Sequence, residues 1–318
     1  MATIVQTDIA WPDDSIERMV IEAAGHELVT GSSSLVSTEA IEALVAMHDP
    51  QAIMTCWAQV SARAVAAPRD LRVVQRVGVG LDNIAVEAAT RRGTWVANVP
   101  DYCVDEVSAH AIALLLAWAR GIVAFDRDVK DGAWDPSIAR LRRVSELTVG
   151  IVGFGRIGRA TERGLRGLGC NVLTNRRSAA EAGAAVELDT LLAASDVVIL
   201  HAPLTAETHH LMNADRIARM KPGAFLINVS RGPLVDNDAL LSALDQGRLS
   251  GAGLDVIDGE PSPPRALVER SDVIVTPHIA FSSDASLAEL RRRSAEEVVR
   301  VLAGEAPHNP CNHPESTC

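Results

Sequence analysis

The sequence has no run of about 18 consecutive apolar residues, the length that a helix needs to cross a bilayer, so no transmembrane segment is expected. Its first residues, MATIVQTDIAWPDDS, lack a basic stretch followed by an apolar one and do not resemble a signal peptide. Positive charge is scarce: 30 lysine and arginine residues face 41 aspartate and glutamate residues, a formal charge of −11. Because like charges repel, neither nucleic acid nor an anionic membrane is an expected partner.

Cysteine is also sparse. The five cysteines lie far apart and form no C-x-x-C pair, so we expect reduced thiols in a cytoplasmic protein, without a disulfide framework and without a metal site. The tail residues Cys311, His313 and Cys318 are the one cluster that could take a metal ion. A frayed chain end is the favoured interpretation of this cluster.

The chain has 318 residues, more than one hydrophobic core usually serves, which favours two domains. Short β-branched runs alternate with helical patterns almost throughout. The first set of predicted strands is TIVQ, HELVT, AIMTC, RVVQRVG and TWVANV, and the second is LTVGIVG, NVLTN, DVVILH, AFLINVS, GAGLDV and DVIVTP. Strand–helix–strand alternation predicts an α/β fold of two doubly wound parallel sheets, each covered by helices on both faces.

Between the two sets lies EVSAHAIALLLAWARGIVAFDRDV, which predicts one long, buried helix of roughly 25 residues connecting the two units. A final helix is predicted over about residues 284–303, and we expect it to return to the first unit. The predicted domains are therefore 1–98 plus 285–318, which are discontinuous in sequence, and 99–284.

A glycine-rich turn follows the first strand of the second set, at Gly153-Phe154-Gly155-Arg156-Ile157-Gly158. The G-x-G-x-x-G spacing alone is weak evidence, but here a strand precedes it and a helix follows it, as dinucleotide binding requires. Gly153 would permit the turn, Gly155 would let the backbone approach a pyrophosphate, and Gly158 would allow close packing of helix on strand. The helix N-terminus offers free N–H groups to the phosphates.

The strand NVLTN ends at Asn175-Arg176-Arg177-Ser178, where NAD sites usually have a carboxylate for the ribose 2′-hydroxyl. A neutral asparagine, two arginines and a serine suit a 2′-phosphate instead, because a guanidinium forms charge-assisted hydrogen bonds to it. We therefore predict NADP in preference to NAD. The alternative is that these arginines belong to a solvated loop.

Reactive side chains follow the next strands. Arg231 follows AFLINVS, Glu260 follows GAGLDV, and His278 follows DVIVTP. Because the carboxyl ends of strands line the ligand crevice of an open α/β sheet, we expect the three side chains to converge. Taken singly, each has a structural alternative: an ion-pair arginine, a loop carboxylate and a buried hydrogen-bonding histidine.

Residues 70–312 resemble the D-isomer-specific 2-hydroxyacid dehydrogenases. The likeness runs through VGVGLDNIAVEAATRRGTWVANVP, VGIVGFGRIG, LHAPLTAETHHLMN, MKPGAFLINVSRGPLVD, GAGLDVIDGEP and TPHIA. It implies a flavodoxin-like substrate domain, a Rossmann cofactor domain and a homodimer. The activity implied is hydride transfer between NAD(P)H and a small 2-keto or 2-hydroxy acid.

The resemblance also implies roles for particular residues. Arg231 would bind the substrate carboxylate, His278 would be the acid–base group, and Glu260 would pair with His278. The substrate loop would be Val77, Gly78, Val79 and Gly80. The cofactor site would comprise the phosphate loop, Asn175 to Ser178, His201, Pro203, Thr208, Val229, Ser230, Asp255, His278 and Ala280. His201 is a second acid–base candidate, although a structural role beside the cofactor is favoured.

The proposed chemistry suits these residue types. Arginine presents a planar fork that matches a carboxylate, and histidine exchanges a proton near neutral pH. A neighbouring carboxylate favours the imidazolium form, which reduction of a keto group requires.

Three alternatives remain. Ala280-Phe281 replaces glycines of many family members and is more similar to the corepressor branch, which would make the protein a nicotinamide sensor. An acid–base histidine argues against that function, because a sensor does not need one. Formate enzymes have glutamine at the position of Glu260, whereas a phosphite dehydrogenase stays compatible with the sequence.

Overall fold

The computed structural model describes residues 1–32, 37–176 and 185–314. The chain divides into two compact units, Met1–Tyr102 with Ser283–Cys318, and Cys103–Ser282. The eleven strands expected from the sequence are all present, five in the first unit and six in the second.

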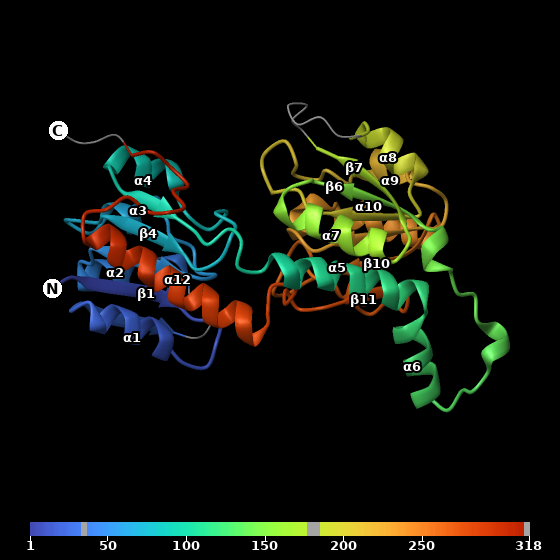
Figure 1. Ribbon diagram of the computed structural model, residues 1–318, viewed down its shortest axis with the longest axis horizontal. Helices are drawn as coiled ribbons and strands as arrows, with labels where there is room; N and C mark the ends of the chain where they lie inside the picture. Colours follow the sequence, from blue (N-terminus) through green and yellow to red (C-terminus); the bar gives the residue numbers. More distant parts are fainter. Residues whose placement is uncertain (33–36, 177–184, 315–318) are drawn as a thin grey trace. The chain divides into compact units, whose positions relative to one another are not determined.

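The first unit is built on a parallel sheet with the order β2-β1-β3-β4-β5 (Figure 1). Its strands are β1 (Thr3–Asp8), β2 (Glu27–Ser32), β3 (Ala52–Thr55), β4 (Val73–Arg76) and β5 (Trp95–Ala97). Every neighbouring pair is parallel. This strand order is that of flavodoxin-like folds, as predicted.

Helices cover both faces of this sheet. On one face, α2 (Thr38–His48), α3 (Ala62–Ala66) and α4 (Val86–Arg92) enclose an aliphatic core that includes Ile41, Ile53 and Val74. On the other face lie α1 (Ser15–Ala23) and α12 (Asp284–Leu302) (Figure 1). The helix α12 begins with a reciprocal capping box between Ser283 and Ser286, which satisfies free backbone N–H groups at its start. The first unit is thus built from both ends of the chain.

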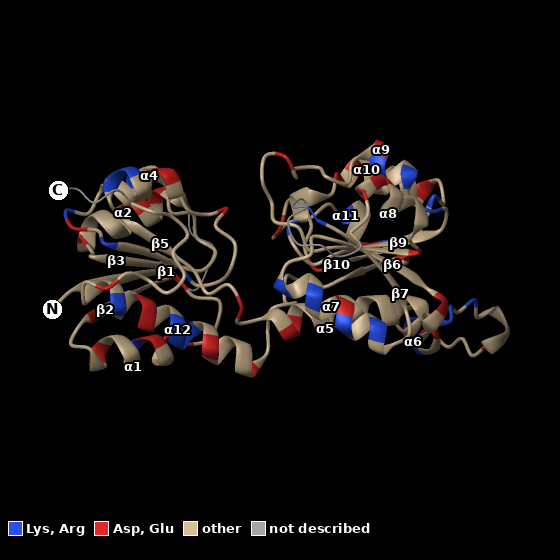
Figure 2. Cartoon of the chain, turned by 45° about the horizontal axis from the view of Figure 1, so that its top comes forward, with Lys and Arg blue, Asp and Glu red and all other residues tan. Residues whose placement is uncertain are grey.

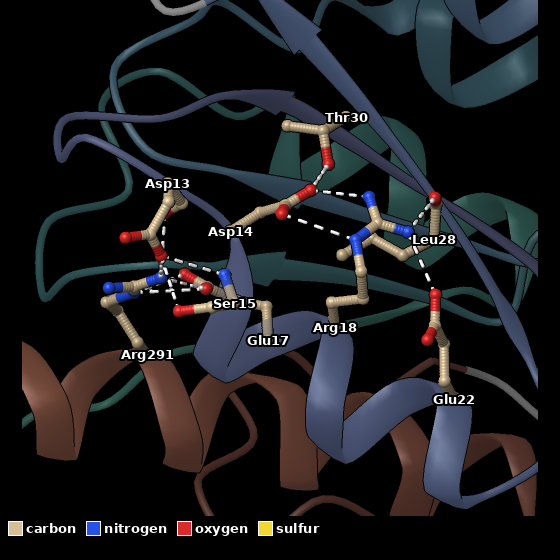
Figure 3. Close-up of polar contacts among 9 residues, drawn as sticks. All are labelled: Asp13, Asp14, Ser15, Glu17, Arg18, Glu22, Leu28, Thr30 and Arg291. Carbon is tan, nitrogen blue, oxygen red and sulfur yellow. Dashed lines mark hydrogen bonds and ion pairs between the residues drawn. The ribbon is translucent and has the colours of Figure 1, made fainter.

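A buried ion pair joins α1 to α12. The guanidinium of Arg291 donates to both carboxylate oxygens of Glu17, at 2.7–3.0 Å, and to the carbonyl of Asp13 at 2.7 Å (Figure 3). The Glu17 side chain is fully buried and that of Arg291 is 9% exposed. The ring of Trp11 lies 5.3 Å from the guanidinium carbon. This cluster connects the first residues of the chain to its last helix.

The second unit has a parallel sheet with the order β11-β10-β9-β8-β6-β7. Its strands are β6 (Thr148–Val152), β7 (Asn171–Asn175), β8 (Val197–Leu200), β9 (Ala224–Asn228), β10 (Leu249–Leu254) and β11 (Val273–Val275). A parallel bridge between Thr174 and Ala185 continues the sheet beyond β7. Counted from β6, the order then becomes that of a Rossmann fold, in which the direction of winding changes between β6 and β8.

Helices again cover both faces of the second sheet. On one side are α5 (Val104–Ala119) and α7 (Arg156–Gly167), which contact each other and the strands (Figure 1). On the other side, α8 (Leu188–Ala194), α9 (Ala214–Arg219), α10 (Asn237–Asp245) and the short α11 (Arg265–Val268) contribute to a core of leucine and isoleucine side chains.

The single long helix expected between the two sets of strands is wrong. The segment forms α5 and then α6 (Ile122–Lys130), with a bend of 58° between them. Gly121 lies at the break with φ +63°, a left-handed conformation that ends a helix and that glycine adopts without steric cost. Within α5, Trp118 stacks on Phe225 of the sheet at 4.7 Å. No single helix among the described residues is long and apolar enough to span a bilayer; the bent α5–α6 pair meets that criterion only when taken together.

Candidate active site

The phosphate loop has the strand–turn–helix geometry expected of it. Gly153 follows β6 with φ +97°, and an added Cβ there would lie 2.5 Å from the backbone nitrogen of Ala202. At Gly158 an added Cβ would lie 2.4 Å from the carbonyl oxygen of Gly153. A Cβ at Gly155, the residue that precedes α7, would meet no protein atom within 4 Å. The fold therefore requires glycine at positions 153 and 158, whereas the space at Gly155 is open for a ligand.

Helix α7 presents arginines along its exposed side. Arg156, Arg159, Arg163 and Arg166 are all exposed, at a spacing of three or four residues that places them on one face (Figure 2). The ring of Phe154 lies 5.0 Å from the guanidinium carbon of Arg159. Positive charge near the phosphate loop thus adds to the partial charge of the helix N-terminus, in an otherwise acidic chain.

The end of β7 carries the residues predicted to select the cofactor. Asn175 donates a hydrogen bond from Nδ2 to the carbonyl of Val186, at 2.9 Å, so its amide group is oriented by the segment that leads to α8. Arg176 follows it and is partly buried. Arg177 and Ser178 lie outside the described residues.

His201 follows β8 beside the phosphate loop. Its Nε2 shares a hydrogen bond of 3.0 Å with Thr161 of α7, and no hydrogen bond to Nδ1 is found among the described residues. Burial lowers the pKa of His201 to about 4. The ring is therefore neutral near pH 7, which suits the structural role better than the acid–base one. In the same segment, the Thr208 hydroxyl donates to the carbonyl of Pro203 at 2.7 Å.

Arg231 lies just beyond β9, in a loop that its neighbours fix. Asn228, which is fully buried, donates to the carbonyl of Arg231 at 2.8 Å and accepts from the backbone N–H of Ser230 at 3.1 Å. The Ser230 hydroxyl donates to the carbonyl of Leu200 on β8 at 2.9 Å. Gly232 then passes so close to the next loop that an added Cβ would lie 2.2 Å from the carbonyl carbon of Ile257.

That next loop follows β10 and carries Glu260. Asn237 of α10 donates to the carbonyl of Asp258 at 3.0 Å, and the backbone N–H of Glu260 donates to the carbonyl of Ile257 at 3.2 Å. The loops that carry Arg231 and Glu260 are therefore in backbone contact at Gly232. They are neighbours because β9 and β10 are paired strands.

His278 lies after β11 and reaches Glu260. Its Nδ1 is 3.1 Å from Glu260 Oε1, with 20% of the His278 side chain and 37% of the Glu260 side chain exposed. Because a carboxylate can only accept, the shared proton lies on Nδ1. His278 has φ +54°, a left-handed conformation that costs a residue with a side chain about 1 kcal/mol.

The first unit holds the predicted substrate loop at the carboxyl end of β4. Arg76 is 6% exposed and donates from Nε to the carbonyl of Gly80 at 2.9 Å and from Nη1 to the carbonyl of Val77. Asn98 donates to the carbonyl of Val79 at 2.7 Å, and the backbone N–H of Val99 donates to the carbonyl of Gly78 at 3.1 Å. Each of the four loop carbonyls therefore accepts a hydrogen bond from another group of the first unit.

Sequence reasoning did not find the residues that shape these loops, namely Arg76, Asn98, Asn228, Thr276 and His110. Each is polar and at least partly buried, and its role depends on which group its side chain contacts in the folded protein, so no spacing in the sequence marks it. Within the described ranges, no group of three or more histidine, cysteine, aspartate or glutamate side chains could hold a metal ion. The four described cysteines are free thiols, and burial raises the pKa of Cys56 to about 12.

Comparison with known proteins decides the family. Residues 112–280 match the family described as "D-isomer specific 2-hydroxyacid dehydrogenase, NAD binding domain". The chain is 42% identical to a glyoxylate reductase from Korarchaeum cryptofilum over 258 residues, which cover 78% of this chain and 77% of that protein. A glyoxylate reductase from Pyrococcus furiosus is also 42% identical, over 76% of this chain and 75% of that protein.

The chain belongs to the D-isomer-specific 2-hydroxyacid dehydrogenase family. It is an oxidoreductase that transfers a hydride between a nicotinamide cofactor and a 2-hydroxy acid.

Solved structures share the whole fold of this dehydrogenase. The TT0316 protein from Thermus thermophilus aligns with a TM-score of 0.89 and 32% identity, over 98% of this chain and all of that one. An NADPH-dependent glyoxylate/hydroxypyruvate reductase from Sinorhizobium meliloti, in complex with NADP and malonate, gives 0.84 and 30% over 97% and 96% of the two chains. A D-lactate dehydrogenase from Aquifex aeolicus, in complex with NAD and lactic acid, gives 0.85 and 26% over 98% and 100%.

Proposed function

We propose that this dehydrogenase reduces a small 2-keto acid with NADPH, using Arg231, Glu260 and His278. The observation that carries the proposal is the hydrogen bond between His278 Nδ1 and Glu260 Oε1, which holds an acid–base group at the end of a strand next to the loop of Glu260. The loop of Arg231 lies beside that of Glu260 and supplies a guanidinium at the same edge of the sheet.

Each side chain then has one task. Arg231 binds the substrate carboxylate through its planar fork and draws electron density from the keto oxygen. His278 gives the proton on Nε2 to that oxygen as the carbonyl carbon is reduced, and in the reverse direction it takes the proton back. Glu260 accepts from Nδ1 throughout, so it fixes the orientation of the ring. For the loop from Val77 to Gly80 we propose substrate binding through its backbone amides.

The described residues fit a dinucleotide. The open space at Gly155 and the N-terminus of α7 suit a pyrophosphate, with Arg156 and Ile157 at the start of the helix. Val229, Ser230, Asp255 and Ala280 follow the strands β9, β10 and β11, and His201, Pro203 and Thr208 follow β8 in the same sheet. The nicotinamide supplies the hydride in reduction and accepts it in oxidation.

The test of this proposal is His278→Gln, assayed with NADPH and glyoxylate. We expect kcat to fall by about 100-fold or more, since general acid catalysis by a positioned side chain contributes that much, while NADPH still binds. His308→Gln is the matched control, because His308 also pairs with a glutamate, Glu297, but belongs to the first unit and not to the loops that carry Arg231, Glu260 and His278. Full activity in His278→Gln would refute the assignment.

The preference for NADP rests on the end of β7. No carboxylate occurs from Asn175 to Ser178, and arginine suits a 2′-phosphate. Arg176→Ala should weaken NADPH binding about 10-fold or more and NADH binding far less, as measured by cofactor fluorescence titration. Arg163→Ala, which removes an exposed arginine from the middle of α7, is the control. Equal losses for both cofactors in Arg176→Ala would contradict the preference.

The substrate class follows from the relatives, which are named as glyoxylate reductases. We propose a 2-keto acid with a small substituent, such as glyoxylate or hydroxypyruvate. A parallel screen of glyoxylate, hydroxypyruvate, pyruvate and larger 2-keto acids, with phosphite as the outlying candidate in the oxidative direction, would identify it. Turnover of phosphite and of none of the keto acids would replace this proposal.

A homodimer is proposed from an apolar arm, defined as residues 121–142. Figure 1 shows α6 and the chain after it extending away from the sheet of the second unit. The arm carries exposed apolar side chains, with Trp134 84% exposed; the others are Ile122, Val123, Val129, Ile138 and Leu141. Exposed apolar side chains concentrated in one segment are typical of a protein interface, and a second copy is the partner that is always present.

A further inference from the structure

A chain of hydrogen bonds runs from helix α5 to the loop of His278. His110 Nε2 lies 2.9 Å from Thr276 Oγ1, and Thr276 Oγ1 lies 2.6 Å from Asp255 Oδ1. Asp255 is 2% exposed, and its carboxylate also accepts the backbone N–H groups of Ile279 and Ala280, each at 2.9 Å. The chain therefore ends on the two residues that directly follow His278.

The direction of each hydrogen bond follows from the donors available. A carboxylate only accepts, so the single hydroxyl proton of Thr276 is donated to Asp255. Thr276 Oγ1 then accepts from His110, which must carry a proton on Nε2. Among the described residues no lysine or arginine forms an ion pair with Asp255, and His110 Nε2, at 3.7 Å from Oδ1, is its one candidate cation. The Thr276 hydroxyl and the two backbone amides are thus the hydrogen-bond donors to this buried carboxylate.

His278 needs such support because of its backbone. It has a left-handed φ of +54°, which a histidine adopts only where surrounding contacts hold it. Its own N–H donates to the carbonyls of Asp255 and Thr276, at 2.8 and 3.0 Å. Residues 276, 279 and 280 are therefore held by one carboxylate, and His278 lies in the turn between them. A change in that carboxylate's position would displace the turn that carries the imidazole.

We infer that Thr276 and His110 are positioning residues for proton transfer: through Asp255 they fix the turn that directs His278 toward Glu260 and the substrate. This inference rests on the proposed acid–base role of His278. Neither residue touches the reacting atoms. Their contribution is confined to the geometry of one side chain, and small displacements of a catalytic group are costly to the rate.

The experiment compares isosteric and conservative variants in single-turnover oxidation of NADPH by glyoxylate. Thr276→Val removes the hydroxyl and keeps the shape, whereas Thr276→Ser keeps the hydroxyl. His110→Leu removes the donor, whereas His110→Gln offers an amide N–H in place of Nε2–H. We expect Thr276→Val to lower the rate about 10- to 100-fold and His110→Leu about 3- to 10-fold, with both conservative variants within about threefold of the parent.

The same Thr276→Val change is then made in His278→Gln. If the threonine acts through His278, it has nothing left to position there, and the double variant should be within about twofold of His278→Gln. An equal loss in both backgrounds would show a general structural role and overturn the inference, as would full activity of Thr276→Val and His110→Leu. If Thr276→Val does not fold, the comparison of His110→Leu with His110→Gln tests the inference independently. Full activity of His278→Gln would instead refute the proposed function itself.

Discussion

The ion pair between Arg291 and Glu17 makes a sharp prediction about stability. The carboxylate of Glu17 is fully buried, and among the described residues the hydrogen bonds to it all come from Arg291 (Figure 3). Replacing Arg291 with methionine keeps most of the aliphatic part of the side chain and removes the guanidinium. Glu17 then stays buried without a cation or a hydrogen-bond donor, and breaking a buried pair in this way costs about 3–5 kcal/mol in unfolding free energy.

Arg292→Met is the matched control. It removes the same group from the next residue of α12, where Arg292 pairs with Glu296 one turn away and about half of each side chain is exposed. Such an exposed pair contributes only about 0.3–0.5 kcal/mol. The double variant Glu17→Leu with Arg291→Met removes both charges and should recover most of the loss, because a buried pair can be replaced by apolar side chains at little cost.

The assay must follow the first unit, because two units need not unfold in one step. Hydrogen exchange of the α12 amides in increasing urea gives the free energy with which that helix opens. Equal costs for Arg291→Met and Arg292→Met would refute the reasoning, because the cost is assigned to the charge that is left buried. Failure of the double variant to recover stability would show that the pair contributes through packing instead.

Three further predictions concern the second unit. Gly232→Ala should lower kcat at least about 10-fold, because a Cβ 2.2 Å from the Ile257 backbone must displace the Glu260 loop. Gly167→Ala, with open space around its Cβ, is the control and should be as active as the parent. Equal activities of the two variants would show that the loops can separate without loss of activity. The pKa of His201 is lowered from 6.5 to about 4, so the unfolded chain binds its proton more tightly: stability is fully present above about pH 6.5 and falls toward pH 4, by up to about 3 kcal/mol. When the unfolding free energy of His201→Gln is measured in urea at several pH values, it should fall less between pH 6.5 and pH 4 than that of the parent. The same fall in both proteins would contradict the assignment. Light scattering should show a dimer of twice the 33.8 kDa chain mass for the parent protein and a monomer for Trp134→Asp. Met47→Asp, at an exposed site of the other unit, should stay dimeric. A parent protein that is already monomeric would contradict the proposed role of the apolar arm as a dimer interface.

The sequence predicted the strands well because each is a short apolar run that parallel sheets bury on both faces. The positions of Arg231, Glu260 and His278 after neighbouring strands could be predicted for the same reason, since each follows such a run and the carboxyl ends of parallel strands share one edge. The prediction of one long helix was wrong at Gly121, because an apolar sequence pattern can continue across a position where the backbone leaves the helical conformation. Nothing in the run around Gly121 distinguishes a left-handed glycine from a helical one.

The support of the site could not be predicted, because it depends on tertiary contacts. His110 and Thr276 are 166 positions apart, and each taken singly suggests an ordinary polar residue of a buried segment. Arg76 is similar: its contacts with Val77 and Gly80 are local, but they depend on a side chain that turns back beneath its own loop. Spacing in the sequence shows which strand end carries a reactive side chain. It cannot show which residues form the hydrogen bonds that position that side chain.

The arrangement of the three side chains also bears on how the family serves several substrates. Arg231, Glu260 and His278 follow the adjacent strands β9, β10 and β11 and belong to one unit. In the proposed roles they recognise only the carboxylate and the oxygen on the neighbouring carbon, which every 2-keto acid has. None of them is assigned to the substituent that distinguishes glyoxylate from pyruvate. Substrate preference must therefore depend on other residues, so exchanging residues around the loop from Val77 to Gly80 should alter which acid is reduced while His278 stays essential.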